Sequence, residues 1–279
     1  MNDPTMRSAI GTVLSTMRAG NVDPATLPDD GHDPTFVEQI APLLEFLYAK
    51  YFRVTLRGVE NLPSNGPALL VANHSGGLPY DGAMLIYALF RDHPAHRRVR
   101  PLVADFVFSS SWMRHVVARS GGVRASAANG ERLLEGGQVV AVFPEGLKGV
   151  GKAFRERYRL RYFGRGGFVR LARRAGVPIT PVAIVGAEEI HPMLGKLTSL
   201  PRRIGIPYIP ITPTFPLLGP LGLLPIPTKW TIEIGRPLPM PAEGDQSRGT
   251  TTELADGVRA RIDAMIADLL VARRSVLFG

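Results

Sequence analysis

A chain of 279 residues can bury one full-sized core, and its composition, 45% hydrophobic and 20% charged, is that of a globular protein rather than a disordered chain or a polytopic membrane protein. The absence of cysteine excludes a disulfide framework, a thiol nucleophile and thiolate metal sites. The 33 Lys and Arg residues outnumber the 24 Asp and Glu residues, and the formal net charge of +9 favours a polyanionic partner such as nucleic acid, anionic lipid headgroups or a phosphorylated cofactor.

The N-terminal segment is expected to precede the folded domain. Residues 1–32 are polar and contain Pro24, Pro28 and Gly31, so we interpret them as an N-terminal extension. They lack the continuous apolar stretch of a secretory signal, and the protein is therefore expected in the cytoplasm. From Pro34 to Phe52, apolar residues recur at the spacing of one helical face, which predicts an amphipathic helix.

Strand and helix patterns alternate along the middle of the chain. Short apolar runs bounded by Pro, Asn and Gly predict strands, and runs with helical periodicity predict the helices between them. The expected strands cover 53–63, 67–74, 101–108, 138–146 and 177–186, and the expected helices cover 82–91, 111–120, 128–137 and 166–176. This alternation predicts an α/β fold with a mixed, largely parallel sheet flanked by helices, in a single domain over residues 33–279.

A proline-rich apolar segment interrupts this alternation at residues 206–228. Its seven prolines between Pro207 and Pro227 exclude a regular helix, and a membrane-spanning helix needs about 20 uninterrupted apolar residues, so we expect an apolar loop. Residues 229–238 then return to a strand pattern. Residues 250–272 have the apolar periodicity of a closing helix.

His74 and Asp81 form the first candidate catalytic pair. His74 ends a buried strand pattern, and Asp81 stands across a glycine-containing turn, at the start of the next helix. A histidine can serve as a general base, and a carboxylate within reach fixes its tautomer and stabilises the imidazolium. Alternatively, Asp81 only caps the helix and His74 hydrogen-bonds to the backbone. These residues alone leave both interpretations open.

A second group of candidate residues follows the strand at 138–146. The strand ends in Glu145 and Gly146, and Lys148 and Lys152 follow. A carboxylate beside these cations is held ionised, and it either binds an alcohol acceptor or anchors the turn. The glycines and Lys152 also resemble a phosphate-binding loop, but alanine follows Lys152 where Ser or Thr would hold magnesium. A nucleotide-binding protein using Gly146 to Lys152 is therefore a minor alternative.

Other catalytic classes have little support in the chain. No Gly-x-Ser-x-Gly elbow is present, and the six histidines form no His-Glu-x-x-His pair, so neither a serine hydrolase nor a metal site is expected. The segment Lys148–Arg174 has ten Lys or Arg residues and a single acid, Glu156, which indicates that an anion docks there. No nucleic-acid reader motif accompanies this charge, so nucleic acid is not the expected partner.

Four segments in chain order, NHSGGLPYD, SGGVRAS, VFPEG and VPITPVAI, resemble the motif blocks of the glycerolipid and lysophospholipid acyltransferase family. The segments GAEEIHPML and PLLGPLGLLPIPTKW make the chain more similar to the diacylglycerol-acyltransferase-like branch. The resemblance covers about Arg53 to Pro239 and implies a glycerol-3-phosphate acyltransferase-like fold. It also favours the catalytic interpretation of His74.

The resemblance implies a role for each matching residue. The family's catalytic His falls on His74 and its partner Asp on Asp81, although six residues separate them where the family has four. The FPEG block ends in Glu145 and Gly146, which are implied to bind the acceptor. The implied mechanism is direct: the histidine takes the proton of the acceptor hydroxyl as it attacks the thioester carbonyl, and no acyl-enzyme or cofactor is required.

Two departures from the family concern the acceptor. The family's acceptor-binding Arg has no obvious counterpart, since Ala127 sits near its place and Arg124 lies three residues earlier; Arg124 and Lys148 are the cations expected to bind the acceptor. Lys148 stands where the family often has Arg, which keeps the charge and loses the bidentate geometry. We therefore expect a neutral or bulkier lipid alcohol rather than glycerol phosphate.

The basic segment and the apolar loop imply further partners. Lys152, Arg155 and Arg165 are expected to meet the phosphates of acyl-CoA or an acidic acyl carrier protein. The apolar loop, helped by the helix from Pro34 to Phe52, is expected to dock peripherally on the cytoplasmic face of an anionic membrane; alternatively, the loop walls the acyl pocket. The competing function is a non-catalytic peripheral protein that binds lipid or another polyanion.

Overall fold

The computed structural model describes residues 4–18, 32–75, 80–109, 111–146, 149, 151–161, 163, 166–197, 208–242 and 249–279. A central sheet has the strand order β1-β9-β6-β2-β5-β3-β4. Its strands are β1 (Thr55–Arg57), β2 (Ala68–Ala72), β3 (Val99–Val103), β4 (Val123–Arg124), β5 (Val139–Val142), β6 (Ile179–Val185) and β9 (Thr231–Ile234). β6 and β9 are antiparallel, and the other neighbouring strands of this sheet are parallel. The predicted mixed, largely parallel sheet is confirmed.

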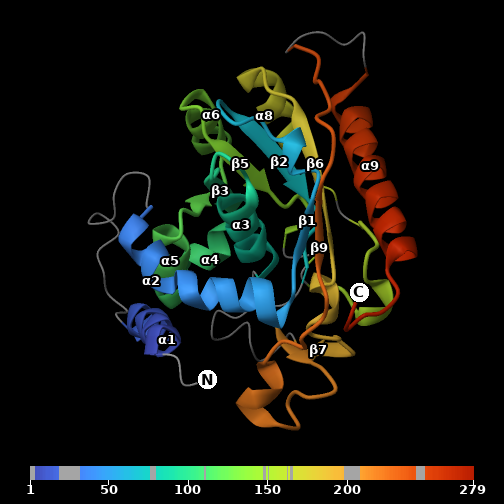
Figure 1. Ribbon diagram of the computed structural model, residues 1–279. Coiled ribbons are helices and arrows are strands. Elements are labelled where there is room, and N and C mark those ends of the chain that lie inside the picture. Colours follow the sequence, from blue (N-terminus) through green and yellow to red (C-terminus); the bar gives the residue numbers. More distant parts are fainter. Residues whose placement is uncertain are drawn as a thin grey trace.

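Helices cover both faces of the sheet (Figure 1). The central strands β2 and β6 are buried along their whole length, which explains their continuous apolar sequences. One face packs against α3 (Tyr80–Asp92) and the π-helical turn η2 (Phe46–Tyr51) that continues α2 (Pro34–Glu45). The other face packs against α6 (Ala127–Glu135), α8 (Gly167–Ala175) and α9 (Thr251–Ala272).

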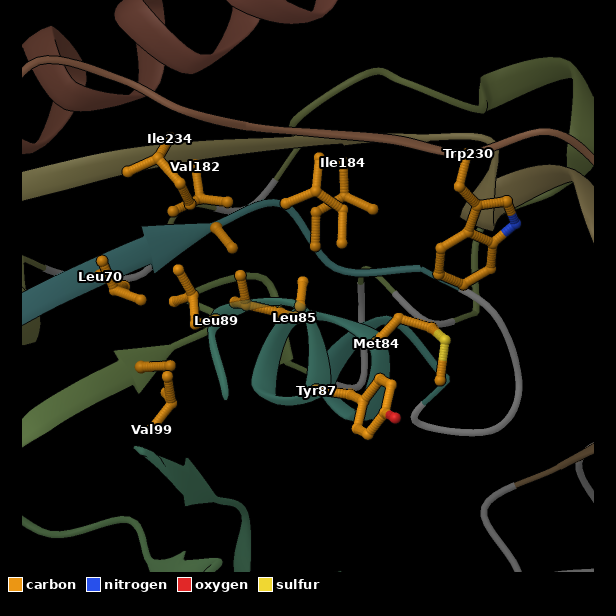
Figure 2. Packing of buried hydrophobic residues seen from close by; sticks show 14 of the residues in the cluster. Leu70, Met84, Leu85, Tyr87, Leu89, Val99, Val182, Ile184, Trp230 and Ile234 are labelled. Carbon is orange, nitrogen blue, oxygen red and sulfur yellow. The ribbon is translucent and has the colours of Figure 1, made fainter. Parts of the chain in front are cut away.

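The apolar cluster between α3 and the sheet supports the start of that helix. Figure 2 shows Met84, Leu85 and Leu89 of α3 together with Leu70 of β2 and Ile184 of β6. These side chains are fully buried, and burying one such side chain contributes about 1.5–3 kcal/mol. The packing therefore fixes α3, and with it Asp81 in its first turn, against the central strands.

The N-terminal part of the chain contains more regular structure than the sequence indicates. A helix, α1 (Pro4–Arg18), lies in the segment interpreted as an extension and packs beside α2. Asp33 caps α2 by accepting a hydrogen bond from the Phe36 amide at 3.1 Å. The expected amphipathic helix from Pro34 to Phe52 is present as α2 and η2.

The strand expected at 101–108 is wrong beyond Val103. Asp105 begins the short helix α4 (Asp105–Ser109), which is followed by α5 (Ser111–Arg119). The pairing of β3 with the edge strand β4 ends at Val103, so no strand ladder supports an extended chain past this point. A short apolar run fits a strand and a helix equally well by its periodicity.

The proline-rich segment contains two short regular elements. The strand β8 (Ile209–Ile211) pairs with β7 (Gly195–Leu197) in a small antiparallel ladder, and a 3-10 helix, η7, spans Gly219–Leu223. Further 3-10 turns are η3 (Val59–Asn61), η4 (Phe154–Glu156) and η5 (Ala187–Glu189). The segment projects beyond the end of the sheet, at the bottom of Figure 1. In the described part of the chain, every helix is too short or too polar to cross a bilayer.

Candidate active site

The candidate site lies where three neighbouring parallel strands end. β6, β2 and β5 are adjacent and run in the same direction. His74 follows β2, Glu145 follows β5, and Glu188 follows β6 in the turn η5. Because the carboxyl ends of parallel strands open at one edge of the sheet, these side chains converge, and this edge is where open α/β sheets bind their ligands.

Asp81 reaches His74 across the longer turn. The Nδ1 atom of His74 lies 2.6 Å from the Oδ2 atom of Asp81, whose side chain is fully buried. The same oxygen accepts a hydrogen bond from the amide of Ser75 at 2.8 Å, and Oδ1 accepts one from the amide of Gly82 at 2.8 Å. An ionised carboxylate only accepts hydrogen bonds, so Nδ1 carries the proton. Asp81 is therefore more than a helix cap, because it orients the imidazole.

The other ring nitrogen of His74 faces away from this contact. Nε2 has no hydrogen bond to any residue within the described ranges, and 18% of the side chain is exposed. The ring packs against Phe143, with 4.9 Å between the ring centroids. The imidazole is thus held on two sides and keeps one basic nitrogen for a substrate, which is the arrangement of a general base.

Opposing influences act on the pKa of His74. Burial has the largest effect and favours the neutral ring, which lowers the pKa. The charge and hydrogen bond of Asp81, helped by the charge of Glu145, favour the imidazolium and outweigh burial. The pKa of His74 is consequently raised above its ordinary value of 6.5. A raised pKa makes the ring a stronger base for a hydroxyl proton.

Glu145 is bound on both oxygens by the protein itself. Its Oε2 accepts a hydrogen bond from the backbone amide of His74 at 3.3 Å, and Nζ of Lys152 lies 3.2 and 3.3 Å from the two oxygens. The side chain is fully buried. The backbone folds tightly around it: Gly146 has a φ of +51°, and a Cβ on Gly149 would lie 2.5 Å from the Glu145 Cβ.

This placement does not match the expected acceptor-binding role of Glu145. An acceptor hydroxyl would have to compete with an ammonium and a backbone amide for its oxygens, and the buried carboxylate has no exposed surface to offer. Of the two readings left open by the sequence, the contacts favour anchoring of the turn. Gly146 contributes the left-handed backbone conformation that this turn requires.

Lys152 is also placed differently from the expectation. Only 5% of its side chain is exposed, and its ammonium lies 3.2 Å from Glu145 Oε1 and 3.2 Å from Glu188 Oε1. A lysine enclosed by two carboxylates cannot present its charge to the phosphates of a donor. The same contacts argue against a phosphate-binding loop, in which this lysine would face the ligand.

The remaining expected site residues fall into two groups. Arg124 is exposed at the edge of the sheet, where it pairs with Asp105 at 3.3 Å, three strand positions or roughly 14 Å from β2. It therefore lies at the edge of the sheet, away from the strand that carries His74. Arg155 is exposed in η4 and is placed to meet a solvent-borne anion. Lys148 and Arg165 lie outside the described residues.

Sequence reasoning missed Glu188. This carboxylate is 5% exposed, accepts a hydrogen bond from the Tyr158 amide at 2.9 Å and contacts Lys152. Burial, partly offset by Lys152, raises its pKa to about 7. The available signal was position: Glu188 comes three residues after the buried strand β6, as Glu145 comes three residues after β5. Among the described residues, no cluster of His, Asp and Glu has the arrangement of a metal site.

Comparison with known proteins agrees with this fold. A family model described as Acyltransferase matches residues 53–185, which include His74, Asp81 and Glu145. The uncharacterized protein Rv0502 of Mycobacterium tuberculosis is 44% identical over 97% of this chain and 76% of its own length. The family match on this α/β fold identifies an acyltransferase. The chain belongs to the acyltransferase family that this model describes.

Two other relatives are more distant. The "DGAT1/2-independent enzyme synthesizing storage lipids" of Bos taurus is 26% identical over 81% of this chain and 63% of its own length. Among solved structures, the 1-acyl-sn-glycerophosphate (LPA) acyltransferase PlsC of Thermotoga maritima superimposes with a TM-score of 0.52 at 19% identity, covering 93% of this chain and 88% of that one. The latter likeness supports the fold.

Proposed function

We propose that this acyltransferase moves a fatty acyl group from a thioester donor, acyl-CoA or acyl carrier protein, to a lipid alcohol at a membrane surface, with His74 as the general base. The observation that carries this proposal is the 2.6 Å contact between His74 Nδ1 and the buried carboxylate of Asp81, at the end of a central strand. The contact leaves Nε2 for a substrate proton.

The proposed reaction is a single acyl exchange. Nε2 of His74 takes the hydroxyl proton as the acceptor oxygen attacks the thioester carbonyl, and Asp81 stabilises the imidazolium that forms. The new ester C–O bond forms, the C–S bond breaks, and the departing thiolate receives the proton from the ring. General-base assistance of this kind contributes typically about 10²- to 10⁴-fold in rate.

A neutral lipid alcohol fits the acceptor side better than a glycerol phosphate. Arg124 is at the sheet edge and pairs with Asp105, so it does not supply a phosphate contact near His74. The name of the bovine relative refers to storage lipids, which are neutral. A hydroxyl on an uncharged lipid requires no cation beside the base.

The proline-rich segment provides the proposed membrane contact. Leu217 is 83% exposed, and its neighbours around η7 are exposed as well. The exposed leucines of this segment are Leu217, Leu218, Leu221, Leu223 and Leu224. A pocket wall would bury these side chains against the protein. Transfer of each leucine from water into a bilayer would instead stabilise docking by about 1.5–3 kcal/mol. We therefore favour docking over the alternative in which the segment lines the acyl pocket.

The direct test is product formation. Purified protein is incubated with vesicles and radiolabelled acyl-CoA as donor. Separate reactions offer one acceptor each: a diacylglycerol, a long-chain alcohol, a lysophosphatidate or glycerol 3-phosphate. We expect a labelled neutral ester from a lipid alcohol without phosphate, in amounts that grow with enzyme. Vesicle binding without thioester consumption, with either acyl-CoA or acyl carrier protein as donor, would instead identify a non-catalytic lipid-binding protein.

A further inference from the structure

We infer that Lys152 is a positioning residue, which acts through Glu145 to hold the backbone of His74 at the end of β2. This inference rests on the proposed role of His74 as the base. It extends the site to a buried charge cluster, Glu145, Lys152 and Glu188, that connects three strand ends. The cluster is defined by contacts of 3.2–3.3 Å around the Lys152 ammonium.

The contacts run in one continuous path. His74 donates its backbone N–H to Glu145 Oε2, both oxygens of Glu145 meet Lys152, and Lys152 meets Glu188 Oε1. Glu188 Oε2 then accepts the amide of Tyr158. Lys152 also donates to the carbonyl of Arg159 at 3.3 Å. The end of β2 is thus connected to that of β5 through Glu145, and the ammonium connects both to the end of β6 through Glu188.

The burial of the cluster explains why a cation is needed there. The side chains of Glu145, Lys152 and Glu188 are 0%, 5% and 5% exposed. An isolated buried carboxylate is costly and takes up a proton instead, whereas a paired and hydrogen-bonded one stays ionised. Lys152 therefore supplies the cation that pairs with Glu145, whose Oε2 accepts the hydrogen bond of the His74 amide.

The position of the His74 backbone matters because it carries the base. Asp81 orients the ring from one side, and Glu145 holds the main chain from the other. A displacement of about 1 Å at a reacting group can cost on the order of 100-fold in rate. Loss of the Lys152 charge should therefore reduce kcat while the binding of the thioester, which Lys152 does not face, remains.

The inference is tested by a double-mutant cycle on the full-length protein. Lys152→Met, Glu145→Gln and the double variant are compared with wild type for kcat and for the KM of acyl-CoA. Arg259→Met, which removes a surface cation from α9, is the matched control and should keep wild-type kinetics. His74→Ala is measured in parallel, so that a failure of the proposed function is recognised separately.

We expect each single variant to lower kcat by about 10- to 100-fold with the KM of acyl-CoA changed less than threefold. We expect the double variant to be no slower than Glu145→Gln, because Lys152 acts only through Glu145. If Lys152→Met does not fold, the triple variant that adds Glu145→Gln and Glu188→Gln remains informative, since neutralising all three partners leaves no unpaired charge in the cluster.

Three results would overturn the inference. The first is a higher KM for acyl-CoA at unchanged kcat, which would make Lys152 a donor contact. The second is a double variant at least 10-fold slower than Glu145→Gln, which would give Lys152 a role of its own. The third is wild-type kcat in Lys152→Met. Each of these leaves the proposed function standing if His74→Ala is inactive, and an active His74→Ala variant would refute that function instead.

Discussion

At the scale of single residues, the His74–Asp81 pair determines how activity should depend on pH. A base must be unprotonated, so activity is present above the pKa of His74 and is lost as the pH falls through it. Asp81 and Glu145 raise that pKa despite burial, so the acid limb of kcat/KM should have its midpoint above 6.5. A pH profile with a fixed, saturating co-substrate measures this midpoint.

Replacing Asp81 by asparagine should move this limb and lower the rate. Burial, which favours the neutral ring, is then opposed only by the smaller effect of Glu145, so the midpoint should shift to lower pH. An amide that donates to Nδ1 also selects the wrong tautomer, which we expect to cost on the order of 100-fold or more in kcat. An Asp81→Asn variant with an unshifted limb and near-native kcat would show that the 2.6 Å contact is structural.

The sequence motifs predicted some of the residues that come together in the site, but not the contacts among its buried charges. His74 and Asp81 were identifiable from a strand end, a turn and a helix start. The contacts of Lys152 were not, because a buried ammonium and a surface ammonium have the same local sequence. Its burial depends on Glu188, which comes 36 residues later and from a strand on the other side of β2. Such long-range pairing of charges requires the sheet order.

At the scale of elements, the leucines around η7 should bind bilayers. Leu217→Asp with Leu223→Asp should reduce flotation with anionic liposomes, because charged groups resist transfer into the apolar layer. Binding of the wild-type protein should weaken with salt without vanishing, because salt screens the electrostatic contribution to binding but not the contribution of the buried leucines. Val271→Asp on α9, where the side chain is 88% exposed, serves as the control. Unchanged flotation by the folded double variant would exclude this segment as the docking site.

The closing helix α9 offers a test of the fold independent of the site. Thr250 and Glu253 form a reciprocal capping box at its start, with the Thr250 amide 2.7 Å from Glu253 Oε2. Thr250→Ala should lower the free energy of unfolding by about 1 kcal/mol and leave kcat unchanged. Urea denaturation followed by circular dichroism measures the first quantity. A loss of activity without a loss of stability would connect this helix start to the site.

Elements with one clear periodicity were predictable, and those decided by neighbours were not. The buried strands β2, β5 and β6 are continuous apolar runs, and α9 repeats its apolar residues at helical spacing. The apolar run from 101 to 108 is divided between β3 and α4 because its partner, the edge strand β4, ends. The local sequence of the run does not indicate where that partner ends. Likewise, α1 is held by packing on α2 and α5.

At the scale of the whole molecule, the fold brings the candidate site and the proline-rich segment to the same end of the sheet, where the Ile226 amide donates to the Ile190 carbonyl at 2.8 Å, just after β6 and η5. The charged cluster and His74 lie at the carboxyl ends of the central strands, and the exposed leucines lie on the segment that projects from the end of the sheet (Figure 1). The proposed function joins the two, because it takes both the acceptor and the acyl chain from a membrane. Activity should therefore be greater with vesicle-borne acceptor than with the same acceptor dispersed singly.

The central claim, that His74 is the base of an acyl transfer, is tested most directly by the kcat of His74→Asn with saturating acyl-CoA and the best lipid alcohol. His96→Asn, at an exposed surface histidine, is the matched control. We predict that His74→Asn keeps the wild-type circular dichroism spectrum and loses at least about 100-fold in kcat, while His96→Asn stays within twofold of wild type. A folded His74→Asn variant with near-native kcat would contradict the account.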